Sequence, residues 1–142
     1  KMINDKFKLK GKLSIALNGE VVREVDNLVV TSGKNYVASR MKDATATAMS
    51  NMAIGSGSTA AAAGNTALGT ELGRVSLTST TVTNNEVAYV ATFGAGTGTG
   101  AITEAGLFNA NSGGTMLCRT VFSVVNKGSA DSMTITWTVT VS

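Results

Sequence analysis

The residues that most often carry out acid–base or nucleophilic chemistry are scarce in this sequence. Its 142 residues include no histidine, and Cys118 is the only cysteine. Ser–His and Cys–His pairs are therefore excluded, and no disulfide can form within the chain. A zinc site would lack its usual ligands. Cys118 stands in the middle of a predicted strand, where a cysteine is expected to pack rather than to react.

Carboxylates are the remaining candidates for catalysis, because two facing acids are enough for glycoside hydrolysis. Most of the nine acidic residues stand at predicted turns or beside other charges, where solvation accounts for them. Glu104 differs because it lies inside an apolar segment, and we predict a structural ion pair with Arg119 on a neighbouring strand. No Asp-rich loop supports a hard-cation site. The sequence therefore predicts no catalytic residue, no metal ligand and no cofactor.

The glycine-rich segment 94–100 matches a phosphate-binding loop only in part. Gly94 and Gly96 begin a G-x-G pattern, but Thr99 occupies the position of the third glycine and no helical pattern follows. We expect a mobile loop between strands. Aromatic residues are not interleaved with Lys and Arg on one face, which argues against a specific nucleic-acid interface. No apolar run is long enough to predict a membrane span.

The net charge of +3 is concentrated at the amino end. Residues 1–12 contain five lysines and one aspartate, a net of +4, so the remaining residues sum to −1. A basic arm over these residues could bind an acidic protein surface or nucleic acid. The same residues could equally form the solvated face of a strand, and the sequence leaves both interpretations open. The candidate partner-binding residues are Lys6, Lys8, Lys10 and Lys12.

A hairpin and one helix are the clearest elements of the first third of the chain. Apolar and polar residues alternate over 7–17, which is the period of a half-buried strand. Asn18-Gly19 suits a two-residue hairpin turn, and residues 20–25 return as the partner strand. A short helix follows, for which Thr31 or Ser32 could act as the N-cap.

Strand patterns dominate the rest of the chain. Segments rich in β-branched or alternating residues cover 75–82, 87–93, 102–108, 116–125 and 133–141. The segment 116–125 is apolar on both faces, Val124 included, which predicts burial on both sides. One helical turn is predicted to start at Asn65 or Thr66. The predicted core residues are Phe93, Phe108, Phe122, Ile135, Trp137 and Val139.

These elements predict an all-β fold, namely an antiparallel, jelly-roll-like β-sandwich of about eight strands with one short helix after the N-terminal hairpin. The length fits a single domain over residues 1–142. The apolar residues, 43% of the chain, are mostly Ala and Val, which bury little surface each. Small cores of this kind are commonly supplemented by oligomerisation.

Several segments resemble small virion proteins of tailed bacteriophages. They are NLVVTSGK at 27–34, MAIGSG at 52–57, TALGTELGR at 66–74 and ITEAGLF at 102–108, and the closing segment 131–141 also fits. The resemblance spans most of residues 27–141. It implies an oligomeric β-sandwich that carries no catalytic residues and binds other virion proteins. It does not separate capsid decoration proteins from tail or fibre components.

A capsid decoration (cement) protein is the role that this resemblance and the small core favour. Such a protein would be made in the host cytoplasm, sit on the outer surface of the virion capsid as a homotrimer, and stabilise the shell by bridging subunits of the major capsid protein. Residues 1–12 would form the bridging arm, by charge and by β-augmentation. The alternative is a tail- or fibre-associated domain that binds a host receptor or glycan through loops 55–64 and 94–100. A carbohydrate-active enzyme, a third class, would need two acids facing each other in a cleft.

Overall fold

The N-terminal hairpin forms as the residue pattern predicts. The computed structural model describes residues 8–42 and 46–142. Strands β1 (Leu9–Leu17) and β2 (Glu20–Val29) are antiparallel, and Asn18 and Gly19 both take positive φ values, 50° and 84°. That geometry is the one a two-residue hairpin turn requires. Leu13 and Ile15 point inward and are at most 1% exposed.

Nine strands of the described residues form one continuous antiparallel sheet, which confirms the predicted all-β class. Their order across the sheet is β4-β3-β7-β8-β2-β1-β9-β6-β5. The remaining strands are β3 (Asn51–Gly55), β4 (Glu71–Ser76), β5 (Ser79–Thr83), β6 (Glu86–Phe93), β7 (Gly100–Phe108), β8 (Met116–Lys127) and β9 (Met133–Val141). The single strand predicted over 75–82 is instead two strands. Between them, the Leu77 and Thr78 amides donate to the carbonyls of Ser50 and Val90, which belong to different parts of the sheet.

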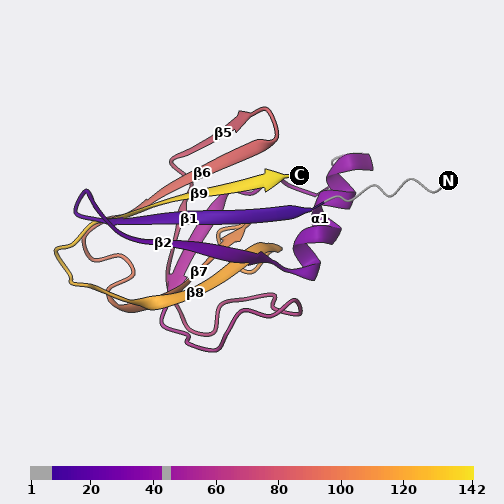
Figure 1. Cartoon of the computed structure of the whole chain (residues 1–142). Helices are drawn as coiled ribbons and strands as arrows, with labels where there is room; N and C mark the ends of the chain where they lie inside the picture. The colour runs from indigo at the N-terminus through magenta and orange to yellow at the C-terminus, as the bar shows by residue number, and fades with distance from the viewer. Residues whose placement is uncertain (1–7, 43–45) are drawn as a thin grey trace.

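The sheet curls into two layers because β2 belongs to both. Along most of its length β2 pairs with β1, but only Leu28 and Val29 pair with β8. Toward the beginning of β2, the strands β2 and β8 separate. The Arg23 guanidinium of β2 spans the gap by donating to the carbonyls of Ser123 and Val124 on β8. Figure 1 shows β5, β6, β9, β1 and β2 side by side in one layer, with β7 and β8 in the other.

The core lies between the two layers. All six predicted core residues are buried, and Trp137 is completely enclosed. Phe108 belongs to a second, smaller cluster with Val30, Ala53, Leu68 and Met116. The expectation of burial on both faces of 116–125 was wrong for Val124, which is 45% exposed. Val124 projects to the side opposite to the buried Val125, and α1 packs on the other end of β8 at Met116 and Leu117, so this face is open to solvent at Val124.

The helix α1 (Thr31–Lys42) lies across one end of the sandwich, as Figure 1 shows. Gly33 is its buried residue, and a Cβ there would overlap the carbonyl of Leu117, so the helix can approach β8 this closely only at a glycine. The prediction of an N-cap at Thr31 or Ser32 was wrong, because both residues lie within the helix and its first backbone hydrogen bond runs from the Lys34 amide to the carbonyl of Val30. The Ser32 hydroxyl instead donates to the carbonyl of Met116 at 3.0 Å, which ties the helix to β8.

Candidate functional site

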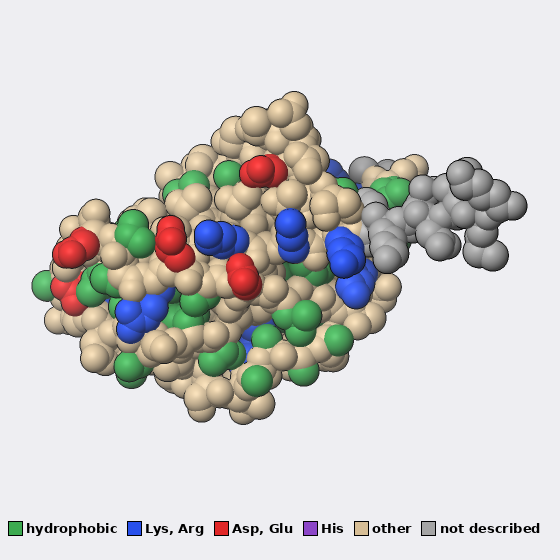
Figure 2. Space-filling view, viewed as in Figure 1, with side chains coloured by type: hydrophobic (Ala, Val, Ile, Leu, Met, Phe, Trp, Pro, Cys, Tyr) green, Lys and Arg blue, Asp and Glu red, His purple; other side chains and the backbone are tan. Residues whose placement is uncertain are grey.

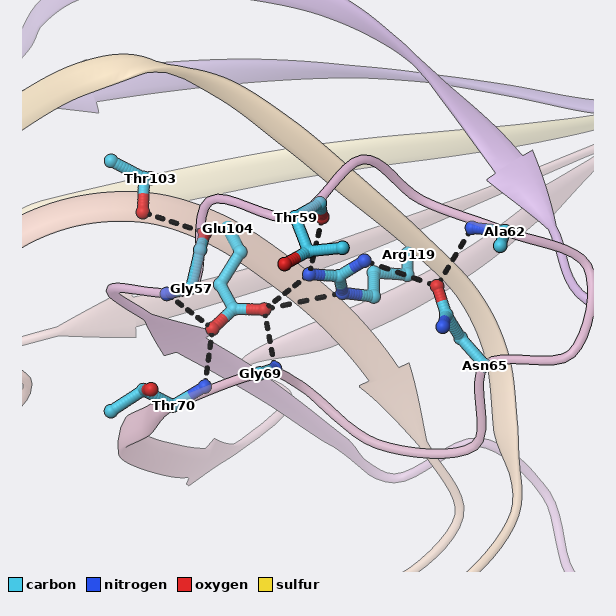
Figure 3. A network of polar contacts seen from close by, with 9 residues as sticks. All are labelled: Gly57, Thr59, Ala62, Asn65, Gly69, Thr70, Thr103, Glu104 and Arg119. Atoms are coloured by element: carbon cyan, nitrogen blue, oxygen red, sulfur yellow. Dashed lines mark hydrogen bonds and ion pairs between the residues drawn. The ribbon is translucent and has the colours of Figure 1, made fainter.

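The loop of residues 56–70 is fastened to the sheet by one carboxylate. Glu104 projects from β7 and is completely buried. Its Oε2 accepts the backbone N–H groups of Gly57 at 2.6 Å and Thr70 at 2.8 Å, and its Oε1 accepts that of Gly69 at 2.8 Å (Figure 3). The two ends of the loop therefore meet at one side chain. The helical turn predicted near Thr66 is not formed, because this segment is part of the loop.

Arg119, from the neighbouring strand β8, completes the arrangement. Its Nη2 and Nε lie 2.9 Å and 3.2 Å from Glu104 Oε1, and the side chain is 2% exposed. The same guanidinium donates to the carbonyl of Thr59 and to Oδ1 of Asn65, each at 3.0 Å (Figure 3). The structure thus brings Glu104 and Arg119 together, and both also hold the loop.

The hydrogen bonds decide the charge state of Glu104. Burial by itself raises the pKa of a carboxyl group, but donation from Thr70, Gly69, Arg119 and Gly57 outweighs burial and holds the pKa of Glu104 below its ordinary value. The side chain is therefore an anion at neutral pH, and its two oxygens accept five hydrogen bonds. It has no proton to donate and no free lone pair facing a cleft, so this geometry suits a structural role.

Glycines make this close approach possible. A Cβ on Gly57 would overlap the Glu104 carboxylate, and a Cβ on Gly55 would overlap the Thr70 carbonyl. The loop backbone can reach the carboxylate only where no side chain intervenes. This explains in physical terms why the sequence has glycine at the end of β3 and just beyond it.

A second feature is the polar outer face of the β2-β1-β9-β6 layer. Lys12 on β1 lies between Asp26 on β2 and Thr138 on β9. Lys10 lies beside Thr140, which is followed in the same row by Glu86 on β6. Charges of opposite sign thus alternate with threonines across the strands. Figure 2 shows lysines or arginines and carboxylates interspersed on the face toward the viewer.

This face is hollowed by a shallow groove of about 750 Å³. Its lining comes from four strands and includes Lys10, Lys12, Glu24, Asp26, Glu86, Thr136, Thr138 and Thr140. A surface with both signs of charge and many hydroxyl groups is suited to another protein rather than to a polyanion, because no single sign of potential extends across it.

The structure places the predicted basic arm inside the sheet as far as it is described. Lys8, Lys10 and Lys12 are exposed, whereas Lys6 lies outside the described residues. Lys8 exchanges two backbone hydrogen bonds of 2.8 Å with Ser142, and residues 9–12 pair with β9. From Gly11 on, the chain cannot add to the edge of another sheet, because it is paired with β2 on one side and with β9 on the other. The lysines form a solvated strand face here.

Other reactive groups in the described residues are enclosed. Cys118 is completely buried, and burial raises the pKa of its thiol well above the ordinary value, so it is not a thiolate at neutral pH. Residues 8–42 and 46–142 contain no group of three or more acidic, cysteine or histidine side chains placed to hold a metal ion. Within the same ranges, no helix has the length and apolar character that crossing a membrane requires.

One buried charge was missed by sequence reasoning. Lys127 at the end of β8 is 1% exposed, and its Nζ donates to the carbonyl of Gly94 at 2.8 Å. It fastens the glycine-rich loop 94–99 to the turn after β8, where Gly96 N–H also donates to the carbonyl of Ser129. A lysine near the end of a strand normally points to solvent, so no local signal marks it as buried.

Comparison with protein-family models, with curated proteins and with solved structures found no match to this chain. A function for this chain therefore has to be inferred from the geometry of its fold and from the resemblance of its segments to virion proteins.

Proposed function

We propose that this chain is a non-enzymatic structural domain of a virion, a capsid decoration protein that binds the major capsid protein through the polar outer face of the β2-β1-β9-β6 layer. The observation that carries the proposal is the groove on this face, with Lys10 and Lys12 projecting between carboxylates and threonines. By seating across two neighbouring shell subunits, the domain would stabilise only the assembled state.

Two properties of the face support a protein partner. The side chains stand on interior strands that are hydrogen-bonded on both sides, so they are held in fixed rows before binding. The charges of both signs can pair with a mixed surface and disfavour a wrongly positioned one. The resemblance of segments 27–34, 52–57, 66–74 and 102–108 to phage virion proteins directs the proposal to a virion, and the small core favours a protein that is covered by neighbours, as on a capsid.

The test is co-sedimentation with capsid shells assembled without this chain. We expect the double variant Lys10→Glu/Lys12→Glu to bind shells at least about tenfold more weakly, because anions then replace both cations that line the groove, and any pairing of these lysines with carboxylates of the partner becomes repulsive. Lys34→Glu is the matched control, since Lys34 is an exposed lysine on α1, away from the groove. Equal binding by both variants would reject the outer face as the contact surface.

Copy number separates the capsid role from the tail-associated role. Quantitative mass spectrometry of separated heads and tails should find this chain in many copies on heads. A few copies confined to tails would instead support a tail- or fibre-associated domain that recognises a host receptor or glycan.

A further inference from the structure

The two end strands of the sheet differ in how they are protected. β4, at one end, carries Glu71 and Arg74, and a Cβ on its Gly73 would crowd Gly98 of the loop 94–99, so this edge is charged and partly covered. β5, at the other end, is exposed at every residue and is the outermost strand of its layer in Figure 1. Exposed edges of this kind are the usual sites of strand addition.

β5 has none of the features that normally block strand addition. Residues 75–85 contain no charged residue and no proline, and β5 itself reads STTVT. The register of β5 with β6 is regular over all five residues. Charges, prolines and bulges are the common means of preventing edge pairing, so this edge is open to a partner strand.

The open edge lies beside an apolar groove. A hollow of about 370 Å³ is lined by Tyr36, Val37, Arg40, Met41, Ala48, Met49, Thr80, Val82, Val87 and Tyr89, so it lies between α1 and the β5–β6 hairpin. Val82 is 70% exposed and Met41 is 76% exposed. A five-residue strand pair does not reach the about 1,000 Å² that a specific interface needs, and this groove supplies further apolar surface next to it.

We propose that β5 pairs antiparallel with β5 of a second copy of this chain, across a two-fold axis at Thr81. Thr80 then lies opposite Val82 of the other copy, and Ser79 lies opposite Thr83. Threonine pairs well with threonine and with β-branched residues across strands, and no like charges meet. A two-fold contact requires one surface that complements itself, and β5 meets this requirement because it carries no charge.

The residues of β5 whose backbone groups face the open edge are the ones that this register would pair. A two-residue turn joins Thr83 to Glu86, so Thr83, Thr81 and Ser79 bond to β6. Thr80 and Val82 therefore direct their N–H and C=O groups to the open side. In the proposed register these two residues face each other across the axis, giving about four backbone hydrogen bonds.

The same register fills the groove. Thr80 and Val82 both line the hollow beside α1, on the face of β5 opposite to Thr81. Because Val82 of each copy lies opposite Thr80 of the other, its side chain is placed at the mouth of the other copy's groove. The exposed valine and the exposed Met41 thereby lose contact with water.

This inference concerns the isolated chain and does not depend on the proposed capsid role. Sedimentation equilibrium of the purified chain should give twice the 14.4 kDa mass at micromolar concentration. Val82→Lys should return it to a monomer, with the dimer dissociation constant raised at least about tenfold. Val21→Lys, which changes an exposed valine on β2, should leave the dimer intact, and circular dichroism should show both variants folded.

Disulfide trapping tests the register. Facing residues at a non-hydrogen-bonded antiparallel pair have Cα atoms about 4.5 Å apart, within disulfide reach. Thr81→Cys should therefore cross-link rapidly under mild oxidation, whereas Val82→Cys should not, because the two Val82 residues are diagonal and about 7–8 Å apart. Cys118 is buried and does not interfere.

Several results would overturn the proposal. They are a monomer at high concentration, a trimer such as the segment resemblance implies, or a dimer that Val82→Lys leaves unchanged. A monomer whose β5 binds only a strand of another protein would also overturn it, because the partner of β5 would then not be a second copy of this chain. Loss of capsid binding alone would bear on the proposed function and not on this inference.

Discussion

Replacing Glu104 by Gln should destabilise the protein much more than its small change in shape suggests. The buried carboxylate accepts three backbone N–H groups and two guanidinium N–H groups. Gln keeps one acceptor oxygen and adds a donor, so either the Gly57 and Thr70 amides or the Gly69 amide and Arg119 lose their acceptor. Arg119, at 2% exposed, would also lose its counter-charge.

The expected loss follows from these groups. Each buried donor left unpaired costs about 1–3 kcal/mol, and removal of one partner of a buried ion pair costs about 3–5 kcal/mol in total. We therefore expect Glu104→Gln to lower the free energy of unfolding by about 3–5 kcal/mol. This is a large part of the about 5–15 kcal/mol available to a typical domain.

Urea unfolding followed by Trp137 fluorescence measures this loss, since Trp137 is buried in the main core. The double variant Glu104→Gln/Arg119→Met should lose less than the sum of the two single variants, because no unpaired charge remains buried. Limited proteolysis should cut residues 56–64 faster in Glu104→Gln than in the unchanged chain. A loss under about 1 kcal/mol, with unchanged proteolysis, would refute the idea that this carboxylate holds the loop.

Three further predictions concern the same network and the core. Gly57→Ala should lower the free energy of unfolding by about 1–3 kcal/mol, because its Cβ overlaps the Glu104 carboxylate. Gly64→Ala is the control and should be close to neutral, because the space around its Cβ is open. Equal effects of the two substitutions would contradict the close approach of Gly57 to Glu104. Since folding lowers the pKa of Glu104 from 4.5, its contribution to stability should be complete above that pH and disappear as the pH falls through the lower pKa of the folded state. Urea titrations of the unchanged chain and Glu104→Gln should therefore converge at acid pH, and a constant difference would count against this assignment. Cys118 should react with a thiol reagent only on unfolding, and rapid reaction of the native protein would show that it is accessible.

Part of the candidate site could be predicted from the sequence, and part could not. A glutamate inside the apolar segment 102–108 indicates a buried partner, and Arg119 is the cation of the next strand. The backbone donors at Gly57, Gly69 and Thr70 carry no such signal. They lie 34–47 positions before Glu104 in the chain and meet it only when the loop folds back.

The lysines at the amino end also show what the sequence can predict and what it cannot. Alternation over 7–17 predicts which lysines face solvent, and Lys8, Lys10 and Lys12 do so. Whether the strand stands at an edge or inside the sheet depends on β9, more than 120 positions later, because β9 fills the open side of β1. The pairing with β2 and β9 therefore excludes strand addition by the part of the predicted arm from Gly11 on, whereas residues 1–7 of that arm lie outside the described residues.

Local sequence patterns are enough to predict the two-residue turn at Asn18-Gly19, the alternating strands and the helix after the hairpin. These depend on residues close in the chain, whose backbone preferences and side-chain period act over a few positions. Three features follow from tertiary contacts alone: β2 joins two layers, the chain changes layer at Leu77 and Thr78, and Lys127 is buried. Each of these depends on hydrogen-bond and packing partners far away in the sequence, and folding alone brings such partners together.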